Sequence, residues 1–181
     1  MEPSEEHLIL AQMEQDFNVE IITQNVDDLH ERAGSTNVLH LYGELTKVRP
    51  EDCCCKEDNY SLKYISDIGY RAVSIWETGG PHNRQLRPHI LWPGEDMPDM
   101  GPALQAVNKA DILLLAGTSL QKYPVPTLCA QVHEECVVYM VSPDAAPARK
   151  VLDGTLIKGN ATSSMEKFRD IAKIIYVWAE E

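Results

Sequence analysis

The fold of this chain is decided by the segment Val19-Glu20-Ile21-Ile22-Thr23-Gln24-Asn25-Val26-Asp27-Asp28-Leu29-His30, which Ala33 and Gly34 follow closely. Its first part is a β-branched apolar run, which is typical of a buried strand. The run ends in clustered glutamine, asparagine and aspartate side chains. In open parallel sheets, nucleotides bind at the carboxyl ends of the strands. The segment therefore predicts a polar, ligand-facing loop at the end of a buried strand.

Outward from this segment, apolar strands alternate with helices. Strands are predicted at 19–24, 38–42, 112–116, 137–141 and 156–157, and helices at about 4–17, 29–33, 102–109, 126–134 and 164–179. Such alternation indicates a Rossmann-like α/β fold, a parallel sheet with helices on both faces. The pattern breaks from Thr46 to about Pro88, where we expect a small inserted module with one helix near 60–68. The predicted domains are 1–45 together with 89–181, and 46–88.

Composition excludes several classes of protein. The chain has 181 residues, a formal net charge of −12 and 44% hydrophobic residues. Binding to nucleic acid needs a basic surface, so it is not expected here. No apolar run approaches the length of a membrane span, and the acidic N-terminus is unlike a targeting signal. We expect a cytoplasmic protein that does not bind membranes, and the sequence does not determine its oligomeric state.

Thr23 to Gly34 closely resembles the TQNVDxLHxxAG motif of the sirtuins, which are NAD-dependent protein-lysine deacylases. Further along the chain, 86–95 reads LRPHILWPGE and resembles the family's LRPHIVWFGE, while 117–124 reads GTSLQKYP and resembles GTSLxVYP. Alone, the GTS run would indicate only a tight turn after a strand. Because the matches occur in order at predicted strand ends, the resemblance implies NAD as the cofactor and an acyl-lysine protein or peptide as the substrate.

The resemblance also implies roles for individual residues. Gln24, Asn25 and Asp27 would hold the nicotinamide and its ribose, and Asn25 and Asp27 would act in catalysis. The remainder of the cofactor would be contacted by Gly117, Thr118, Ser119, Ser142 and Ala161. The acyl-lysine peptide, added as an extra strand, would be bordered by Trp92, Gly94 and Glu95. Pro93 replaces a phenylalanine of the family, which removes a backbone donor and an aromatic wall from this region.

Tyr42 occupies the position of the family's catalytic histidine. A general base for neutral pH needs a pKa near 7; histidine ordinarily has a pKa of about 6.5 and tyrosine about 10. We therefore expect an impaired deacylase, or alternatively a non-catalytic domain that binds NAD, ADP-ribose or a protein partner. His40, on the same predicted strand face as Tyr42, either substitutes as the base or is a packed or surface histidine. The sequence also lacks the family's first strand and glycine turn, so we expect an N-terminally truncated form of the family domain.

The cysteines do not follow the zinc pattern of the family, which is two CxxC pairs in the small module. Cys53, Cys54 and Cys55 are adjacent, and three adjacent side chains cannot easily reach one tetrahedral ion. Zinc, or any other metal, is therefore not expected. Cys129 and Cys136 lie in the predicted nucleotide domain and are interpreted as core thiols.

Overall fold

The computed structural model describes residues 1–51, 61–118, 123–142, 154–159 and 161–179. The chain divides into two compact units. The first comprises Met1–Ile21, Leu29–Val38 and Met100–Glu181, and the second comprises Ile22–Asp28 and Leu39–Asp99. These units do not follow the predicted domain bounds, because residues 22–28, 39–45 and 89–99 belong to the second unit. The division into an inserted module and a nucleotide domain stays a prediction.

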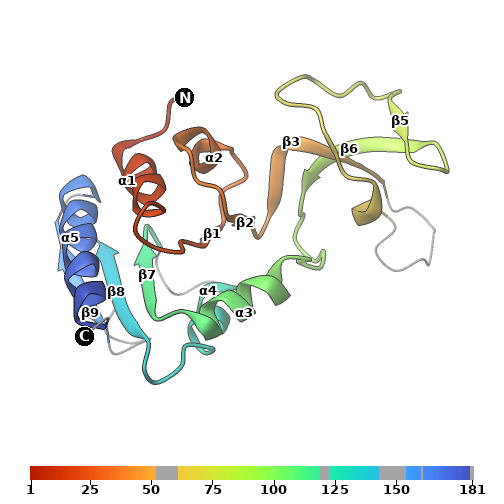
Figure 1. The fold of residues 1–181 in the computed structure, drawn as a ribbon. Helices are drawn as coiled ribbons and strands as arrows, with labels where there is room; N and C mark the ends of the chain where they lie inside the picture. The colour runs from red at the N-terminus through yellow and green to blue at the C-terminus, as the bar shows by residue number, and fades with distance from the viewer. Residues whose placement is uncertain (52–60, 119–122, 143–153, 160, 180–181) are drawn as a thin grey trace. The chain divides into compact units, whose positions relative to one another are not determined.

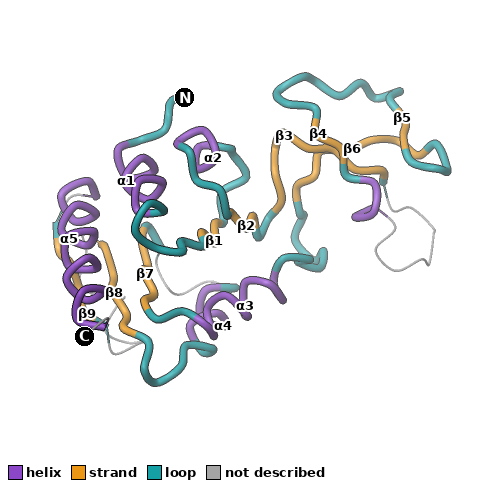
Figure 2. The backbone as a smooth tube through the Cα atoms, in the orientation of Figure 1, coloured by secondary structure: helices purple, strands orange, loops and turns teal. Residues whose placement is uncertain are grey.

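A parallel sheet forms the centre of the first unit (Figures 1 and 2). It consists of β7 (Ile112–Ala116), β8 (Val137–Ser142) and β9 (Thr155–Lys158), in the order β7-β8-β9. Leu114 lies opposite Tyr139 and Met140 opposite Leu156, so all three strands run in register in the same direction. The three strands predicted here are confirmed. Their apolar runs form strands because both faces of the sheet are covered.

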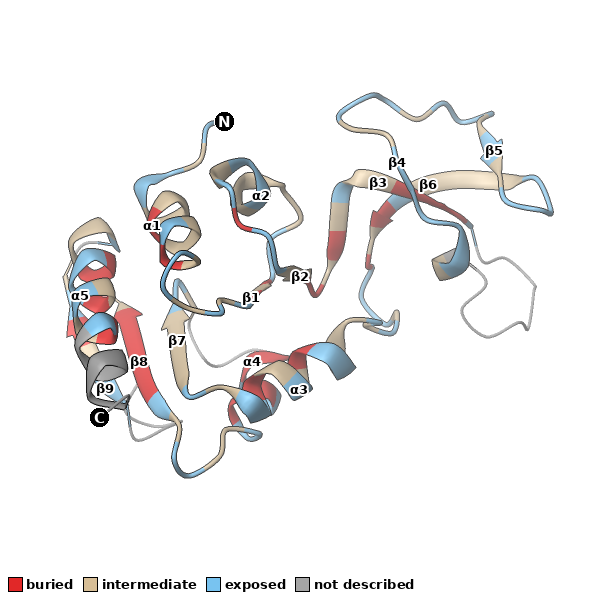
Figure 3. Ribbon diagram, viewed as in Figure 1, coloured by how far each residue is buried: buried red, intermediate tan, exposed pale blue. Residues whose placement is uncertain are grey.

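Helices cover both faces of this sheet. Tyr139 and Val141 of β8 pack with α1 (Glu5–Met13) and α5 (Ala161–Ala179), whereas Met140 packs with α4 (Val125–Cys129). Successive side chains of a strand point to opposite faces, so one strand contributes to both layers. β8 is accordingly the most completely buried strand of this sheet (Figure 3). The predicted Rossmann-like α/β fold is confirmed.

The remaining helices agree with prediction in position but not always in length. α2 (Leu29–Ala33) has the predicted bounds and ends at Gly34, whose φ of +110° suits a helix terminus. α3 (Met100–Lys109) starts two residues earlier than expected. α1 and α4 end at Met13 and Cys129, about one turn short of prediction, because turns follow both helices. No helix in the described part of the chain is long and apolar enough to cross a membrane.

The second unit contains a four-stranded sheet that the sequence did not predict. β3 (Gly43–Pro50), β4 (Ser66–Asp67), β5 (Thr78–Gly79) and β6 (Arg84–Ile90) are ordered β4-β3-β6-β5, and every adjacent pair is antiparallel. The helix predicted near 60–68 is wrong beyond Tyr64: a single 3₁₀ turn, η1 (Ser61–Tyr64), is followed by β4. Most residues of these strands are partly buried or exposed, so the apolar pattern on which the prediction relied is weak.

The strands flanking the opening motif are short. β1 (Ile21–Thr23) and β2 (Val38–His40) pair with each other. In the described part of the chain, neither strand joins the β7-β8-β9 sheet. β2 ends at His40, and Tyr42 lies in the turn before β3. The expectation that His40 and Tyr42 share a strand face is therefore wrong. The chain must turn here because Gly43 already belongs to the antiparallel pair with β6.

Candidate functional site

Backbone hydrogen bonds hold the loop after β1 in place. The Leu41 N–H donates to the Thr23 carbonyl at 3.0 Å, and the Leu45 N–H donates to the Val26 carbonyl at 2.7 Å. The buried Thr23 hydroxyl oxygen accepts the Asn25 N–H at 3.0 Å. Gln24 and Asn25 are exposed, while Asp27 is half-buried. The loop is thus fixed through its main chain and through Thr23, and it presents the amide side chains of Gln24 and Asn25 to solvent.

His40 is a packed residue that supports this loop. Its side chain is buried, and Nδ1 lies 2.9 Å from the Asn25 carbonyl oxygen. A carbonyl oxygen can only accept, so Nδ1 carries the proton in this contact. The structure shows a packed histidine whose Nδ1 is occupied in positioning Asn25, and the alternative that His40 substitutes as the base stays a prediction. Neighbouring Asp28 accepts a hydrogen bond from the Tyr70 hydroxyl.

The main chain of Tyr42 is tightly constrained, although its side chain is only half-buried. The Tyr42 carbonyl accepts the Leu91 N–H at 2.9 Å. Gly43 has a φ of +83°, and a Cβ there would lie 2.0 Å from the His89 carbonyl oxygen. Only glycine permits this close approach of two backbones. Tyr42, which the resemblance assigns to the position of the family's base, is therefore placed by the pairing of β3 with β6.

The turn after β6 carries the three residues assigned to the peptide. Trp92 is 65% exposed, and Gly94 has a φ of +96° with open space around it. The Glu95 carboxylate does not stand free: it accepts hydrogen bonds from Arg49, from Arg87 and from the Trp92 N–H. Sequence reasoning missed the two arginines. Their positions on paired strands would have revealed them only if the antiparallel pairing of β3 with β6 had been predicted.

The residues assigned to the rest of the cofactor lie at the carboxyl ends of the parallel strands of the first unit. Gly117, which follows β7, is exposed with a φ of +64° and has open space where a Cβ would be. Thr118 follows it, Ser142 ends β8, and Ala161 begins α5 just after β9. Since β7, β8 and β9 are parallel and in register, these residues share one edge of the sheet. Ser119 lies outside the described residues.

Of the cysteines considered above, Cys53, Cys54 and Cys55 lie outside the described residues, so the prediction about them is not tested. Cys129 is buried against Val125 and Met140, which confirms it as a core thiol, and burial raises the pKa of this thiol. Cys136 is half-buried, and burial likewise raises the pKa of its thiol. A raised pKa disfavours the thiolate, the form that binds metals and reacts as a nucleophile.

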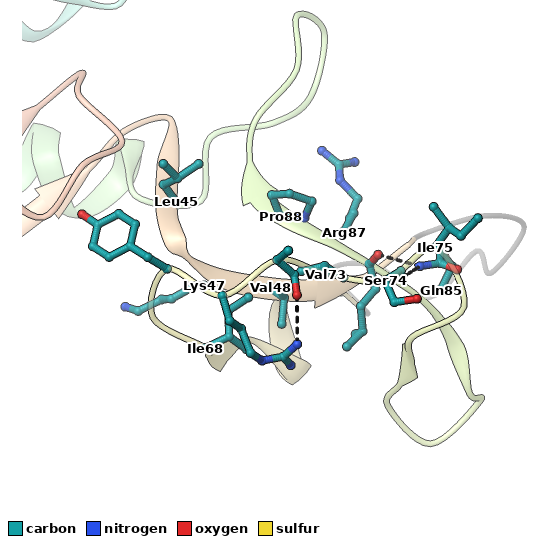
Figure 4. Close-up of a pocket in the computed structure, with 14 residues that line it drawn as sticks. Leu45, Lys47, Val48, Ile68, Val73, Ser74, Ile75, Gln85, Arg87 and Pro88 are labelled. Carbon is teal, nitrogen blue, oxygen red and sulfur yellow. Dashed lines mark hydrogen bonds between the residues drawn. The ribbon is translucent and has the colours of Figure 1, made fainter.

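The second unit also contains an open groove of about 620 Å³ beside β3 and β6 (Figure 4). It is lined by Leu45, Val48, Ile68, Val73 and other residues of 68–75 and 85–88. Gln85 donates to the Ser74 carbonyl at 3.1 Å across this region. Among the residues that the structure describes, none of those predicted to bind cofactor or substrate lines the groove.

Comparison with known proteins agrees with this arrangement. The Sir2 family model matches residues 1–124. An "NAD-dependent protein deacylase" of Bacteroides thetaiotaomicron is 37% identical over 173 residues, covering 94% of this chain and 71% of its own length. A protein with the same name from Aggregatibacter actinomycetemcomitans is 43% identical over 143 residues, covering 78% and 64%. A solved Sir2 homologue in complex with NAD superposes with a TM-score of 0.75 at 30% identity, covering 96% of this chain and 66% of its own.

The chain thus spans about two thirds of the length of these relatives. The residues that the family model matches include the opening motif, the turn after β6 and the end of β7. The chain belongs to the Sir2 family.

Proposed function

We propose that this chain is a sirtuin-type NAD-dependent protein-lysine deacylase whose turnover is reduced by tyrosine at position 42. The observation that carries the proposal is the loop after β1, whose main chain is held by Leu41 and Leu45 while Gln24 and Asn25 remain exposed. A rigid loop with outward amides suits a hydrogen-bonding ligand such as a nicotinamide ribose. The names of the relatives and the NAD complex of the Sir2 homologue support the same cofactor.

The described residues fit NAD in two places. Exposed amides at Gln24 and Asn25, with the carboxylate of Asp27, offer donors and acceptors for the nicotinamide half. The open space at Gly117 lets a ligand approach the backbone after β7, next to the Ser142 hydroxyl at the end of β8. When bound, NAD would supply the ribose carbon that the acyl oxygen attacks, and nicotinamide would be the leaving group. The protein must orient both substrates, exclude water and take up one ribose hydroxyl proton.

The proton uptake is the step that this chain is expected to perform poorly. A phenol is protonated at neutral pH and donates a hydrogen bond rather than accepting a proton. His40 is not expected to substitute as the base, because its side chain is buried against the loop that carries Asn25. The loss of a general base ordinarily costs about 10²–10⁴-fold in rate. The expected activity is therefore low at neutral pH.

The test compares the protein with Tyr42→His and with Tyr42→Phe as the matched control. Formation of the deacetylated peptide is measured with NAD and an acetyl-lysine peptide. We expect Tyr42→His to be about 10²-fold faster or more, and Tyr42→Phe to remain as slow as the parent, since a protonated phenol supplies no base. Rapid turnover by the parent that Tyr42→Phe abolishes would refute the impairment.

Tyr42 also favours a second function, a non-catalytic domain that binds NAD, ADP-ribose or a protein partner. Calorimetric titration separates the alternatives, because binding does not need a base. Asp27→Ala and Ser119→Ala should each weaken ADP-ribose binding by about 1–3 kcal/mol if these residues contact the ligand. If ADP-ribose binds and Tyr42→His still shows no turnover, the binding function replaces the deacylase. If the protein binds neither NAD nor ADP-ribose, the remaining alternative is a domain that binds a protein partner.

A further inference from the structure

Two arginines of the second unit lie directly opposite each other. Arg49 of β3 and Arg87 of β6 are cross-strand partners in the antiparallel pair. Like charges in this position destabilise a sheet. The Arg49 side chain is only 6% exposed, so its charge is also removed from most of the water that would otherwise stabilise it. This arrangement needs a carboxylate between the two guanidinium groups.

Glu95 supplies that carboxylate. Its Oε2 lies 2.9 Å from Nη2 of Arg49 and 3.1 Å from Nη2 of Arg87, and its Oε1 lies 2.5 Å from Nη1 of Arg87. The contact with Arg87 is therefore bidentate, the strongest geometry for this kind of pair. Burial raises the pKa of Glu95, but hydrogen bonds from Arg87 and the Trp92 N–H, with both arginine charges, lower it more. The net pKa is below the ordinary value, so Glu95 is ionised at neutral pH.

The same three side chains fix the main chain around them. Oε2 of Glu95 accepts the Trp92 N–H at 2.9 Å, and Nη2 of Arg87 donates to the Ile90 carbonyl at 2.7 Å. Between these two contacts, the Leu91 N–H donates to the Tyr42 carbonyl at 2.9 Å. The ion pairs thus anchor the segment 90–95 at both ends, and the middle of that segment holds the main chain at position 42.

We propose that Arg49 and Arg87, acting through Glu95, are positioning residues for the substrate side of the site. They hold the Trp92–Glu95 turn and the main chain of Tyr42 in one fixed geometry. The inference rests on the proposed function, which places this turn against the acyl-lysine peptide. It assigns Glu95 a role in shaping the turn rather than in contacting the peptide.

The first test measures peptide binding in the full chain saturated with ADP-ribose. Glu95→Gln and Arg87→Met are expected to weaken the affinity for an acetyl-lysine peptide by about 10–100-fold, the usual range for a misplaced site. Their affinity for ADP-ribose should change less than about twofold, because Gly117, Ser142 and Ala161, which are assigned to that part of the cofactor, belong to the first unit. Arg87→Lys should restore part of the loss. Arg71→Met is the matched control, since Arg71 forms an exposed ion pair with Glu77.

The second test needs no peptide. The NMR shift of the Trp92 amide, which donates to Glu95, is followed against pH in the parent and in Arg87→Met. Removing Arg87 should raise the midpoint toward the ordinary value of a glutamate, whereas Arg71→Met should leave it unchanged. A loss of stability alone would not move this midpoint.

The outcomes separate the two proposals. Equal peptide affinities in the parent, Glu95→Gln and Arg87→Met would overturn the positioning role while leaving the deacylase function standing. An unchanged Trp92 midpoint in Arg87→Met would overturn it as well. If the parent binds ADP-ribose but no acetyl-lysine peptide, while the midpoint shifts as expected, the positioning of the turn stands and the proposed function fails.

Discussion

Alanine at Gly43 is expected to destabilise the second unit strongly. The φ of +83° costs a residue with a Cβ about 1–2 kcal/mol. The new Cβ would lie 2.0 Å from the carbonyl oxygen and 2.9 Å from the carbonyl carbon of His89, both backbone atoms of the paired strand. β3 and β6 would have to separate locally, which adds about 1–3 kcal/mol, as overpacking usually does. The total is about 2–5 kcal/mol.

Two other glycines provide matched controls. Gly94 also has a positive φ, of +96°, but nothing lies within 4 Å of its Cβ position. Gly94→Ala should therefore lower the free energy of unfolding by about 1–2 kcal/mol, the cost of the backbone conformation alone. Gly101 lies in α3 with open space around it, and Gly101→Ala should stabilise the protein by up to about 1 kcal/mol. Urea unfolding followed by circular dichroism gives the three free energies. If Gly43→Ala costs no more than Gly94→Ala, the close approach to His89 is not present and the placement of Tyr42 by this pairing is wrong.

Further predictions concern pH, metal and the core. Burial, together with the charge of Arg49, lowers the pKa of His89, so the unfolded chain takes up its proton more readily. Stability should therefore decline as pH falls below about 6.5, and His89→Gln, but not His82→Gln, should reduce this decline in urea titrations. Elemental analysis should find no stoichiometric zinc, and a chelator should leave the unfolding curve unchanged; tightly held zinc would contradict our interpretation of Cys53–Cys55. Phe168 packs edge-on against Tyr139 at 5.5 Å, so Phe168→Ala should cost about 3–5 kcal/mol, and a loss below about 1 kcal/mol would contradict the described core.

The parallel sheet was predictable because its strands are continuous apolar runs. Ile112–Ala116 and Val137–Ser142 are covered on both faces, and short apolar runs of this kind are typical of a buried strand. The antiparallel sheet of the second unit was not predictable in the same way. Its strands are partly exposed on both faces, and two of them are only two residues long, so neither periodicity nor length distinguishes them from loops.

The sequence alone determined the family motif, the polar loop at Gln24–Asp27 and the tyrosine at position 42, because these depend on residue types in a fixed order. Only the tertiary structure decided what supports them. His40 holds the Asn25 carbonyl. Glu95 pairs with Arg49, 46 positions away in the sequence, and with Arg87, 8 positions away. Such contacts depend on strand register, which brings distant residues to within 3 Å or so and has no local signal in the sequence.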